Sequence, residues 1–333
     1  MRAPPERPIF VVGSGRSGTT WIGDTLASAE GCCSLFEPLN ARRVPEVPAW
    51  GHTSGLPGPY LRPDESAQPW RAFYERLLWG GISNAWIRQD DDRVLSGLGR
   101  LPFGERIGYR LAMMRYQRAE ATCARYVVKE IRANLMLGWL SQRFRVRVVF
   151  VLRHPCAVVG SRLRLGWEAD MRDVLSQANL MHDHLGPCRA AIEGAATPLQ
   201  RQAVLWCVEN LVPLRLAAQR PDWLLCTYED CVRDPGVFDR LFRALALTAG
   251  PATEEVRRQL VSNPDAPPDR EKPWHHPLRE AEAEEVLRIC QDFGINVYGK
   301  QERPVCDPRH PLALRDRGVP GPSHGPEPMA FFI

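Results

Sequence analysis

Short continuous apolar runs alternate along this chain with longer segments of mixed polarity. The runs at residues 8–12 (PIFVV), 125–130 (RYVVKE) and 147–152 (RVVFVL) are shorter than a typical buried helix, and we expect them to form buried strands of a parallel sheet. Residues 32–37 (CCSLFE) and 223–228 (WLLCTY) predict two further short strands. The pattern therefore predicts an α/β fold.

Around these strands, the spacing of apolar and polar residues predicts helices. Strands and helices that alternate in this way form a parallel sheet with right-handed crossovers and with helices on both faces. The expected fold is a three-layer α/β/α domain with a central parallel sheet. The expected helices span residues 18–29, 70–79, 106–123, 135–143, 199–219, 237–246, 254–261 and 278–293.

Length and composition indicate how the 333 residues divide. A chain of this length can bury one sizeable core, and we expect a single domain over residues 1–300. Residues 40–104 shift to Pro, Gly and Trp with scattered charge, which indicates an insertion over the core. Its aromatic residues could offer stacking faces to a ligand or form a second core, and both alternatives stay open. Residues 301–333 are rich in Pro and Gly and predict a surface arm.

Charge and cysteine content limit the kinds of ligand and partner that we expect for this protein. A net charge of +4 without blocks of like charge argues against nucleic acid as the main partner and favours a local basic pocket for an anionic ligand. The N-terminal region lacks the features of a signal peptide, and no apolar run approaches the roughly 18 residues of a membrane span, so we expect a cytoplasmic protein. The 10 cysteines lack zinc-binding spacing, so no metal is expected. The oligomeric state, a homodimer included, stays open.

A glycine-rich turn, GSGRSGTT at residues 13–20, follows the first predicted strand and opens a helix. In this setting successive backbone N–H groups converge on a phosphate at the positive end of the helix dipole. Gly13 and Gly18 have Walker-type spacing, but Thr19 stands where a lysine would reach the terminal phosphates of ATP or GTP. The turn therefore favours a ligand with a single 5′-phosphosulfate, with an ordinary strand-to-helix turn as the alternative. The residues that would hold this group are Gly15, Arg16, Ser17, Gly18, Thr19 and Thr20.

The turn resembles the 5′-phosphosulfate loop of the sulfotransferases that use 3′-phosphoadenosine 5′-phosphosulfate (PAPS). That loop reads approximately P-(K/R)-S-G-(T/S)-(T/S), and this chain has GRSGTT at residues 15–20, with the arginine of carbohydrate-type and bacterial members. A second motif resembles the family's 3′-phosphate site, an Arg at a strand end and a Ser eight residues later, here Arg153 and Ser161. The resemblance implies a P-loop-like, nucleotide-binding sulfotransferase fold.

Arg153 also has a physical reason to bind phosphate. It leaves an apolar strand at its carboxyl end, where open α/β sheets bind ligands. A guanidinium can grip a phosphate with two parallel N–H groups. Without the first loop, Arg153 and Ser161 could equally be a surface pair.

The resemblance implies further contacts with the nucleotide. Tyr228, in WLLCTYEDCVRDP, corresponds to the family's tyrosine that lies against adenine. Trp21 matches the position whose ring stacks on adenine, with a core aromatic on the first helix as the alternative. Arg270 and Lys272 are candidates for the family's basic loop at the 3′-phosphate, or belong to a solvated basic loop.

Sulfuryl transfer is an in-line displacement in which negative charge grows on the leaving oxygen, so cations are needed there. We expect Arg16 to face this oxygen. Lys129, at the end of its strand, is the expected second cation, with a surface lysine as the alternative.

The acceptor hydroxyl is a poor nucleophile and needs a base. Cytosolic members use a His two residues after the matching lysine, and this chain has Ile131 there. Glu37 has the Glu-Pro-Leu setting of carbohydrate-type and bacterial members and is the expected base, with a capping or salt-bridging role as the alternative. Glu130 and Asp24 are the further candidates.

The sequence thus predicts a metal-independent sulfotransferase that moves the sulfuryl group of PAPS to a hydroxyl of a carbohydrate or a hydroxylated small metabolite. The product of the donor would be adenosine 3′,5′-diphosphate. Two rival hypotheses stay open. One is an ATP-dependent small-molecule kinase, and the other is a non-catalytic nucleotide-binding module that needs neither Glu37 nor Lys129.

Overall fold

The computed structural model describes residues 6–50, 56–82, 85–89, 123–259, 278–301 and 303–308. Within these residues, the chain folds around a five-stranded sheet in the order β2-β3-β1-β4-β5, in which every neighbouring pair is parallel. The predicted α/β fold with a central parallel sheet is confirmed. The strands are β1 (Ile9–Gly13), β2 (Cys32–Phe36), β3 (Arg125–Glu130), β4 (Arg147–Leu152) and β5 (Leu224–Thr227).

The central strand β1 shows why the strand sequences are apolar throughout. It pairs with β3 on one side and with β4 on the other. Phe10 and Val12 pack into the core on one face, Ile9 and Val11 pack into the core on the opposite face, and all four are fully buried. A strand that is covered on both faces needs apolar side chains at every position.

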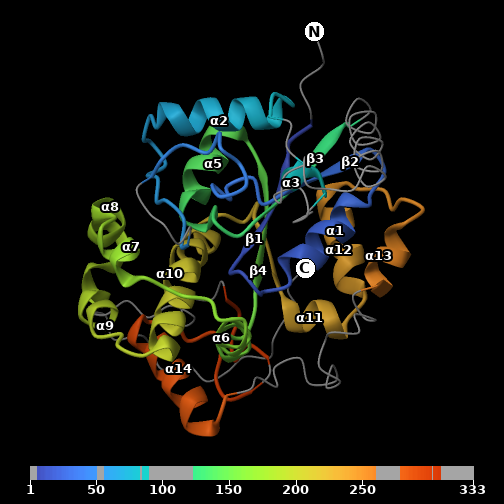
Figure 1. The fold of residues 1–333 in the computed structure, drawn as a ribbon. Coiled ribbons are helices and arrows are strands. Elements are labelled where there is room, and N and C mark those ends of the chain that lie inside the picture. The colour runs from blue at the N-terminus through green and yellow to red at the C-terminus, as the bar shows by residue number, and fades with distance from the viewer. Residues whose placement is uncertain are drawn as a thin grey trace, which may run out of the picture.

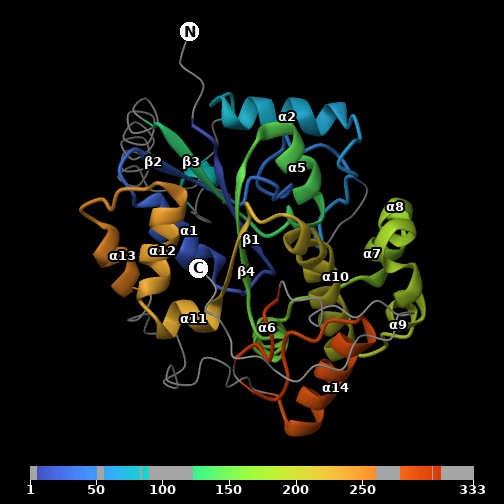
Figure 2. The ribbon, with the colours of Figure 1, turned by 180° about the vertical axis from the view of Figure 1, so that it is seen from behind.

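Helices cover both faces of the sheet and complete a three-layer α/β/α arrangement (Figures 1 and 2). One face carries α1 (Thr19–Ala27), α11 (Tyr228–Arg233) and α12 (Gly236–Leu245), with α13 (Thr253–Gln259) beside α1. The other face carries α2 (Gln68–Leu78), α5 (Leu137–Phe144), α6 (Pro155–Arg164), α10 (Pro198–Gln219) and α14 (Glu280–Asp292). Short helical segments complete the described chain: α3 (Ala85–Gln89), Asn134–Met136, α7 (Met171–Leu175), α8 (Ala178–Leu180), Met181–Leu185, Gly186–Cys188 and α9 (Arg189–Glu193).

The predicted helices correspond to α1, α2, α5, α10, α12, α13 and α14, with boundaries that differ by a few residues. The short helices between residues 171 and 193 were not predicted. Of the helix expected at residues 106–123, only Cys123 lies within the described part of the chain. Residues 309–333 of the expected C-terminal arm also lie outside it.

The aromatic residues of the predicted insertion belong largely to the core. Trp70, Phe73 and Tyr74 are buried on α2 in the same apolar cluster as the sheet residues of that face. They extend the main core and are not stacking faces for a ligand. Trp79, just after α2, is 58% exposed.

The strand order places a topological switch point between β1 and β4. The chain leaves β1 toward β2, on one side of the sheet, and leaves β4 toward β5, on the other side. Open α/β sheets bind ligands at the carboxyl ends of such a pair of strands. The glycine-rich loop after Gly13 and the segment that starts at Arg153 both lie at this point.

Candidate functional site

The glycine-rich loop is packed closely against β4. Gly13 ends β1, and a Cβ atom at this position would lie 2.3 Å from the carbonyl oxygen of Val151. Only glycine permits this approach. Helix α1 begins at Thr19 and has no acidic side chain in its first turn, so its positive end is suited to an anion. Ser17 Oγ is buried without a hydrogen-bond partner among the described residues.

Gly18 lets the loop meet Tyr228. Gly18 caps α1 with a φ of 85°, in the left-handed region. A Cβ atom there would lie 2.3 Å from Cδ2 of the Tyr228 ring. The ring of Tyr228, at the start of α11, therefore lies directly against the end of the loop.

Replacing Gly18 by alanine is expected to displace either the loop or the Tyr228 ring, because the new methyl group would overlap that ring. The left-handed backbone adds a cost of about 1–2 kcal/mol for alanine. If the site binds the adenosine 3′,5′-diphosphate that the motifs predict, we expect this affinity, measured by isothermal titration, to fall at least about tenfold, as when one aromatic stack on a base is lost. Gly166→Ala is the matched control, because Gly166 has a φ of 65° but no atom within 4 Å of the new Cβ. Equal affinity losses in both variants would contradict the role of Tyr228.

The two sequence motifs that carry the family resemblance meet at Arg16. Arg16 Nε donates a hydrogen bond to Ser161 Oγ at 3.1 Å. Arg153 Nη1 donates to the carbonyl oxygen of Arg16 at 2.9 Å. The Arg153 guanidinium also lies over the Tyr228 ring, 4.1 Å from its centroid. Residues that are more than 130 positions apart in the sequence thus form one polar cluster at the ends of β1 and β4.

This cluster concentrates positive charge. Partial burial and the neighbouring charges of Arg153, Arg164 and Arg162 lower the pKa of Arg16. Guanidinium groups that crowd together repel one another, and an anion placed among them relieves the repulsion. The site is therefore suited to a multiply charged anionic ligand.

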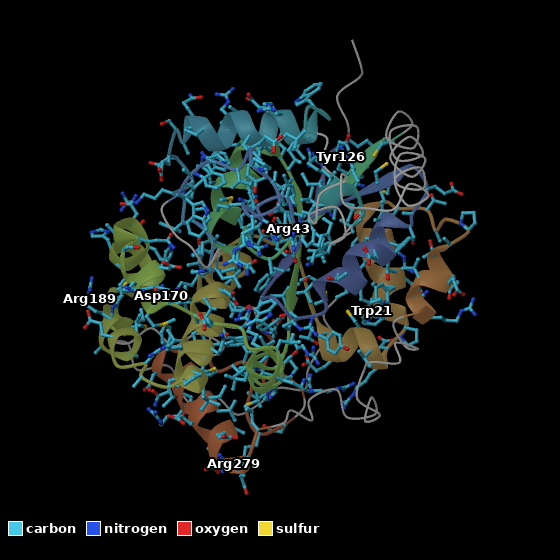
Figure 3. The ribbon with its side chains drawn as sticks, viewed as in Figure 1. Trp21, Arg43, Tyr126, Asp170, Arg189 and Arg279 are labelled. Atoms are coloured by element: carbon cyan, nitrogen blue, oxygen red, sulfur yellow. The ribbon has the colours of Figure 1, made fainter. Side chains whose placement is uncertain are left out.

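Trp21 lies behind Tyr228 in the apolar cluster formed by α1, α11 and α12. Its ring is 5% exposed and makes edge contacts with Tyr228 and Phe238, with centroid distances of 6.1 and 5.0 Å. Figure 3 places Trp21 among the side chains beside α1 and α11. This burial favours the alternative of a core aromatic, which supports the Tyr228 ring from behind, over direct stacking of Trp21 on adenine.

A second charged cluster lies at the ends of β2 and β3. Glu37 forms ion pairs with Lys129 through Oε1 and with Arg132 through Oε2, the latter at 2.8 Å. Lys129 is 4% exposed and Glu37 is 8% exposed, so the pair is shielded from water. Glu37 also has a φ of 38°, a left-handed conformation that is costly for a non-glycine residue.

The charged neighbours set the protonation of Glu37. Burial by itself would raise its pKa, but the charges of Lys129 and Arg132 and their hydrogen bonds outweigh burial and lower the pKa. Asp24, on α1, behaves in the opposite way, because burial raises its pKa to about 6 against the weaker effect of Lys129. The two carboxyl groups near Lys129 therefore differ in the pH range over which they can accept a proton.

Glu130 has a structural role as an acceptor of backbone hydrogen bonds. It is fully buried, and its carboxylate accepts the backbone N–H groups of Leu39 at 2.7 Å and Arg132 at 2.8 Å. These bonds hold the segments that follow β2 and β3. Burial raises the pKa of Glu130.

No family model matches the chain, and no curated protein matches its sequence. Among solved structures, the fold is similar to the sulfotransferase domain from the curacin biosynthetic pathway, with a TM-score of 0.45 and 14% identity, over 87% of this chain and 99% of that one. It is also similar to the sulfotransferase domain from the Synechococcus PCC 7002 olefin synthase, with a TM-score of 0.45 and 18% identity, over 88% of this chain and 96% of that one. A third similar structure is sulfotransferase STF9 from Mycobacterium avium, with a TM-score of 0.42 and 16% identity, over 87% of this chain and 76% of that one.

These similar solved structures are sulfotransferases. With TM-scores below 0.5, the likenesses by themselves assign no function to this chain. The residues of the site have to carry that assignment.

The structure brings most of the predicted site residues together in two adjoining groups. The loop residues, Arg153, Ser161 and Tyr228 form one group, and Glu37 and Lys129 form the other. Arg270 and Lys272 lie outside the described residues. Within the described ranges, no group of three or more His, Cys, Asp or Glu side chains is arranged to hold a metal ion. None of the helices described has the length and apolar character that crossing a membrane requires.

Two arginines at the site were not predicted from the sequence. Arg132 pairs with Glu37, and its position three residues after Lys129 at the end of a strand was an available signal. Arg162 is fully buried next to Ser161 and forms an ion pair with Glu209 of α10. Glu209 gives no local signal, because it lies in the middle of a long helix whose other residues are mostly apolar.

Proposed function

We propose that this protein transfers the sulfuryl group of PAPS to a hydroxyl of a carbohydrate or a hydroxylated small metabolite. The observation that carries the proposal is the contact of Arg16 with Ser161 at 3.1 Å and with Arg153 at 2.9 Å. A loop suited to one phosphate group thereby adjoins an Arg-Ser pair suited to another. A nucleotide with groups at both the 5′ and 3′ positions can use both, whereas ATP carries all its phosphates at one position.

In this proposal, the loop from Gly15 to Thr20 holds the 5′-phosphosulfate with backbone N–H groups at the start of α1. Arg153 and Ser161 bind the 3′-phosphate, and the half-buried ring of Tyr228 lies against the adenine, supported by Trp21. The crowding of guanidinium groups around Arg16 fits a donor that carries several negative charges. When bound, PAPS supplies an activated sulfuryl group whose leaving group is adenosine 3′,5′-diphosphate.

At the reacting end, Arg16 and Lys129 are proposed to neutralise the charge that grows on the leaving oxygen. Glu37 is the proposed base for the proton of the acceptor hydroxyl. In the free protein, Lys129 and Arg132 hold Glu37 as a weakly basic carboxylate. If Lys129 turns from Glu37 toward the sulfuryl oxygens when the donor binds, the basicity of Glu37 rises at the stage at which it is needed.

Isothermal titration with adenosine 3′,5′-diphosphate tests the nucleotide assignment. We expect binding by the unaltered protein and at least about a tenfold loss in Arg153→Ala, because charge-assisted bonds to phosphate are removed. Arg172→Ala is the matched control, since Arg172 is a surface arginine paired with Asp170 and its side chain is 89% exposed. Absence of binding, or undiminished affinity in Arg153→Ala, would rule out the assignment.

Transfer is tested with PAPS and a panel of hydroxylated acceptors, without added metal. Sulfated product is expected with at least one carbohydrate or small hydroxylated acceptor. A protein that binds the nucleotide but sulfates no acceptor of a broad panel would favour the non-catalytic module. Turnover of ATP that depends on magnesium would favour the kinase.

A further inference from the structure

A buried ion pair lies beneath the glycine-rich loop, outside the groups assigned above. Arg162 of α6 and Glu209 of α10 meet at 2.7 Å between Nη2 and Oε2, and both side chains are completely shielded from solvent. Removing two charges from water is costly, and apolar residues of similar size often stabilise a core equally well. The pair therefore calls for an explanation other than the stability of the core.

The pair and its neighbours hold the first residues of the loop. Arg162 Nε donates to the carbonyl oxygen of Gly15 at 3.2 Å. Asn210, next to Glu209 on α10, donates through Nδ2 to Ser14 Oγ at 2.8 Å. Two helices thus grip the loop at Ser14 and Gly15, immediately after β1 ends.

The hold on the Gly15 carbonyl fixes the direction of one peptide group. The peptide bond between Gly15 and Arg16 is not among the cis bonds of the described chain, so its C=O and N–H groups point in opposite directions. When Arg162 draws the carbonyl oxygen down toward α6, the N–H of Arg16 turns away from α6. In a phosphate-binding loop, N–H groups oriented in this way form the concave face that receives the anion.

The loop needs such a hold at this point. Arg16 has a φ of 79°, which is strained for any residue other than glycine. Position 15 has no room for a side chain that could hold the loop by packing, because a Cβ atom there would lie 2.8 Å from the Trp167 ring. The carbonyl oxygens on both sides of the strained residue are bound by arginines, that of Gly15 by Arg162 and that of Arg16 by Arg153.

We propose that Arg162, oriented by Glu209, is a positioning residue for the 5′ end of the nucleotide. It holds the Gly15 carbonyl so that the N–H of Arg16 faces the 5′-phosphate group, and it does not itself touch the ligand, because it is fully buried. This inference rests on the proposed nucleotide site. The inference predicts different effects at the two phosphate positions. In the proposed site, Arg153 and Ser161 bind the 3′-phosphate, and Arg162 does not contribute to that contact.

The test compares adenosine 5′-phosphate with adenosine 3′-phosphate, each titrated calorimetrically. The double variant Arg162→Met/Glu209→Leu removes both charges together and so leaves no buried charge unpaired. We expect it to lose about 10- to 100-fold in affinity for adenosine 5′-phosphate, the scale of a lost hydrogen bond to a charged group, with affinity for adenosine 3′-phosphate within about threefold of the unaltered protein. If the ion pair only stabilised the fold, the double variant would lose affinity for both ligands equally or for neither.

Two further variants complete the experiment. Arg162→Lys keeps the charge beside Glu209, but a single ammonium cannot reproduce the forked contacts of the guanidinium, so the same selective loss is expected even if the double variant does not fold. Arg164→Met removes a positive charge from the same helix, and it is expected to change the two affinities by similar factors. Undiminished affinity for adenosine 5′-phosphate in Arg162→Lys, or an equal loss for both ligands, overturns the positioning role. An unaltered protein that binds neither of these ligands nor adenosine 3′,5′-diphosphate overturns the proposed function itself.

Discussion

Replacing Lys129 by alanine is expected to lower the kcat of sulfuryl transfer by about 10²- to 10³-fold, the usual effect of removing one group that stabilises charge in a transition state. Lys129 is 4% exposed at the end of β3, so its ammonium group acts where water screens charge poorly. The measurement is kcat at saturating PAPS and saturating acceptor. Affinity for adenosine 3′,5′-diphosphate, measured separately, is expected to change by less than about threefold, because the proposed contacts with the nucleotide are made by the loop and Arg153.

The matched control is Arg132→Ala, which removes the other cation that pairs with Glu37. Arg132 lies after β3 and is not a proposed contact of the leaving oxygen, so we expect Arg132→Ala to lower kcat less than Lys129→Ala does. If Lys129→Ala keeps kcat within about threefold, Lys129 does not act on the leaving oxygen. Its role is then limited to the ion pair with Glu37.

The second large effect is expected for Glu37→Gln, which should lower kcat by about 10²- to 10⁴-fold if Glu37 is the base. A base works in its deprotonated form, so activity falls as the pH drops through the pKa of that group in the folded protein. Lys129 and Arg132 lower the pKa of Glu37, whose ordinary value is about 4.3. We therefore expect kcat/KM, which reports on the free enzyme, to show no acidic limb between about pH 5 and pH 8.

Asp24 provides the contrasting case within the same protein. Burial raises its pKa to about 6, so a base at Asp24 would make kcat/KM fall below that pH. Asp24→Asn is expected to leave both kcat and the pH profile nearly unchanged. An acidic limb near pH 6 that disappears in Asp24→Asn would move the role of base from Glu37 to Asp24.

The two charged clusters of the site differ in how their positive charges are neutralised. Without ligand, Lys129 is neutralised by Glu37, whereas Arg16 lies among other guanidinium groups. The proposed nucleotide end is thus suited to an anion, while the proposed reacting end is held in an internal ion pair. In the proposed mechanism, binding of the donor changes the partner of Lys129 and so couples the proposed base, Glu37, to the presence of the sulfuryl group.

The sequence by itself determined the parts of this protein that depend on local pattern. Short segments rich in apolar residues indicated strands of a parallel sheet, and the five strands lie at those segments. The turn with Gly13 and Gly18 indicated an anion loop, because it joins a strand to the start of a helix. The structure adds that these two glycines let the backbone pass close to Val151 and Tyr228. The family resemblance supplied Arg153 and Ser161. Neither the anion loop nor this pair depended on knowing which residues lie nearby in the fold.

Only the tertiary structure decided which distant groups neutralise or hold one another. Glu37 is a base candidate by its motif, but its low pKa follows from Lys129 and Arg132, more than 90 positions later in the chain. The pairing of Arg162 with Glu209 also depends on how α6 and α10 pack. Electrostatic effects vary with distance and burial in space, and a sequence does not specify these until the sheet order and the helix packing are known.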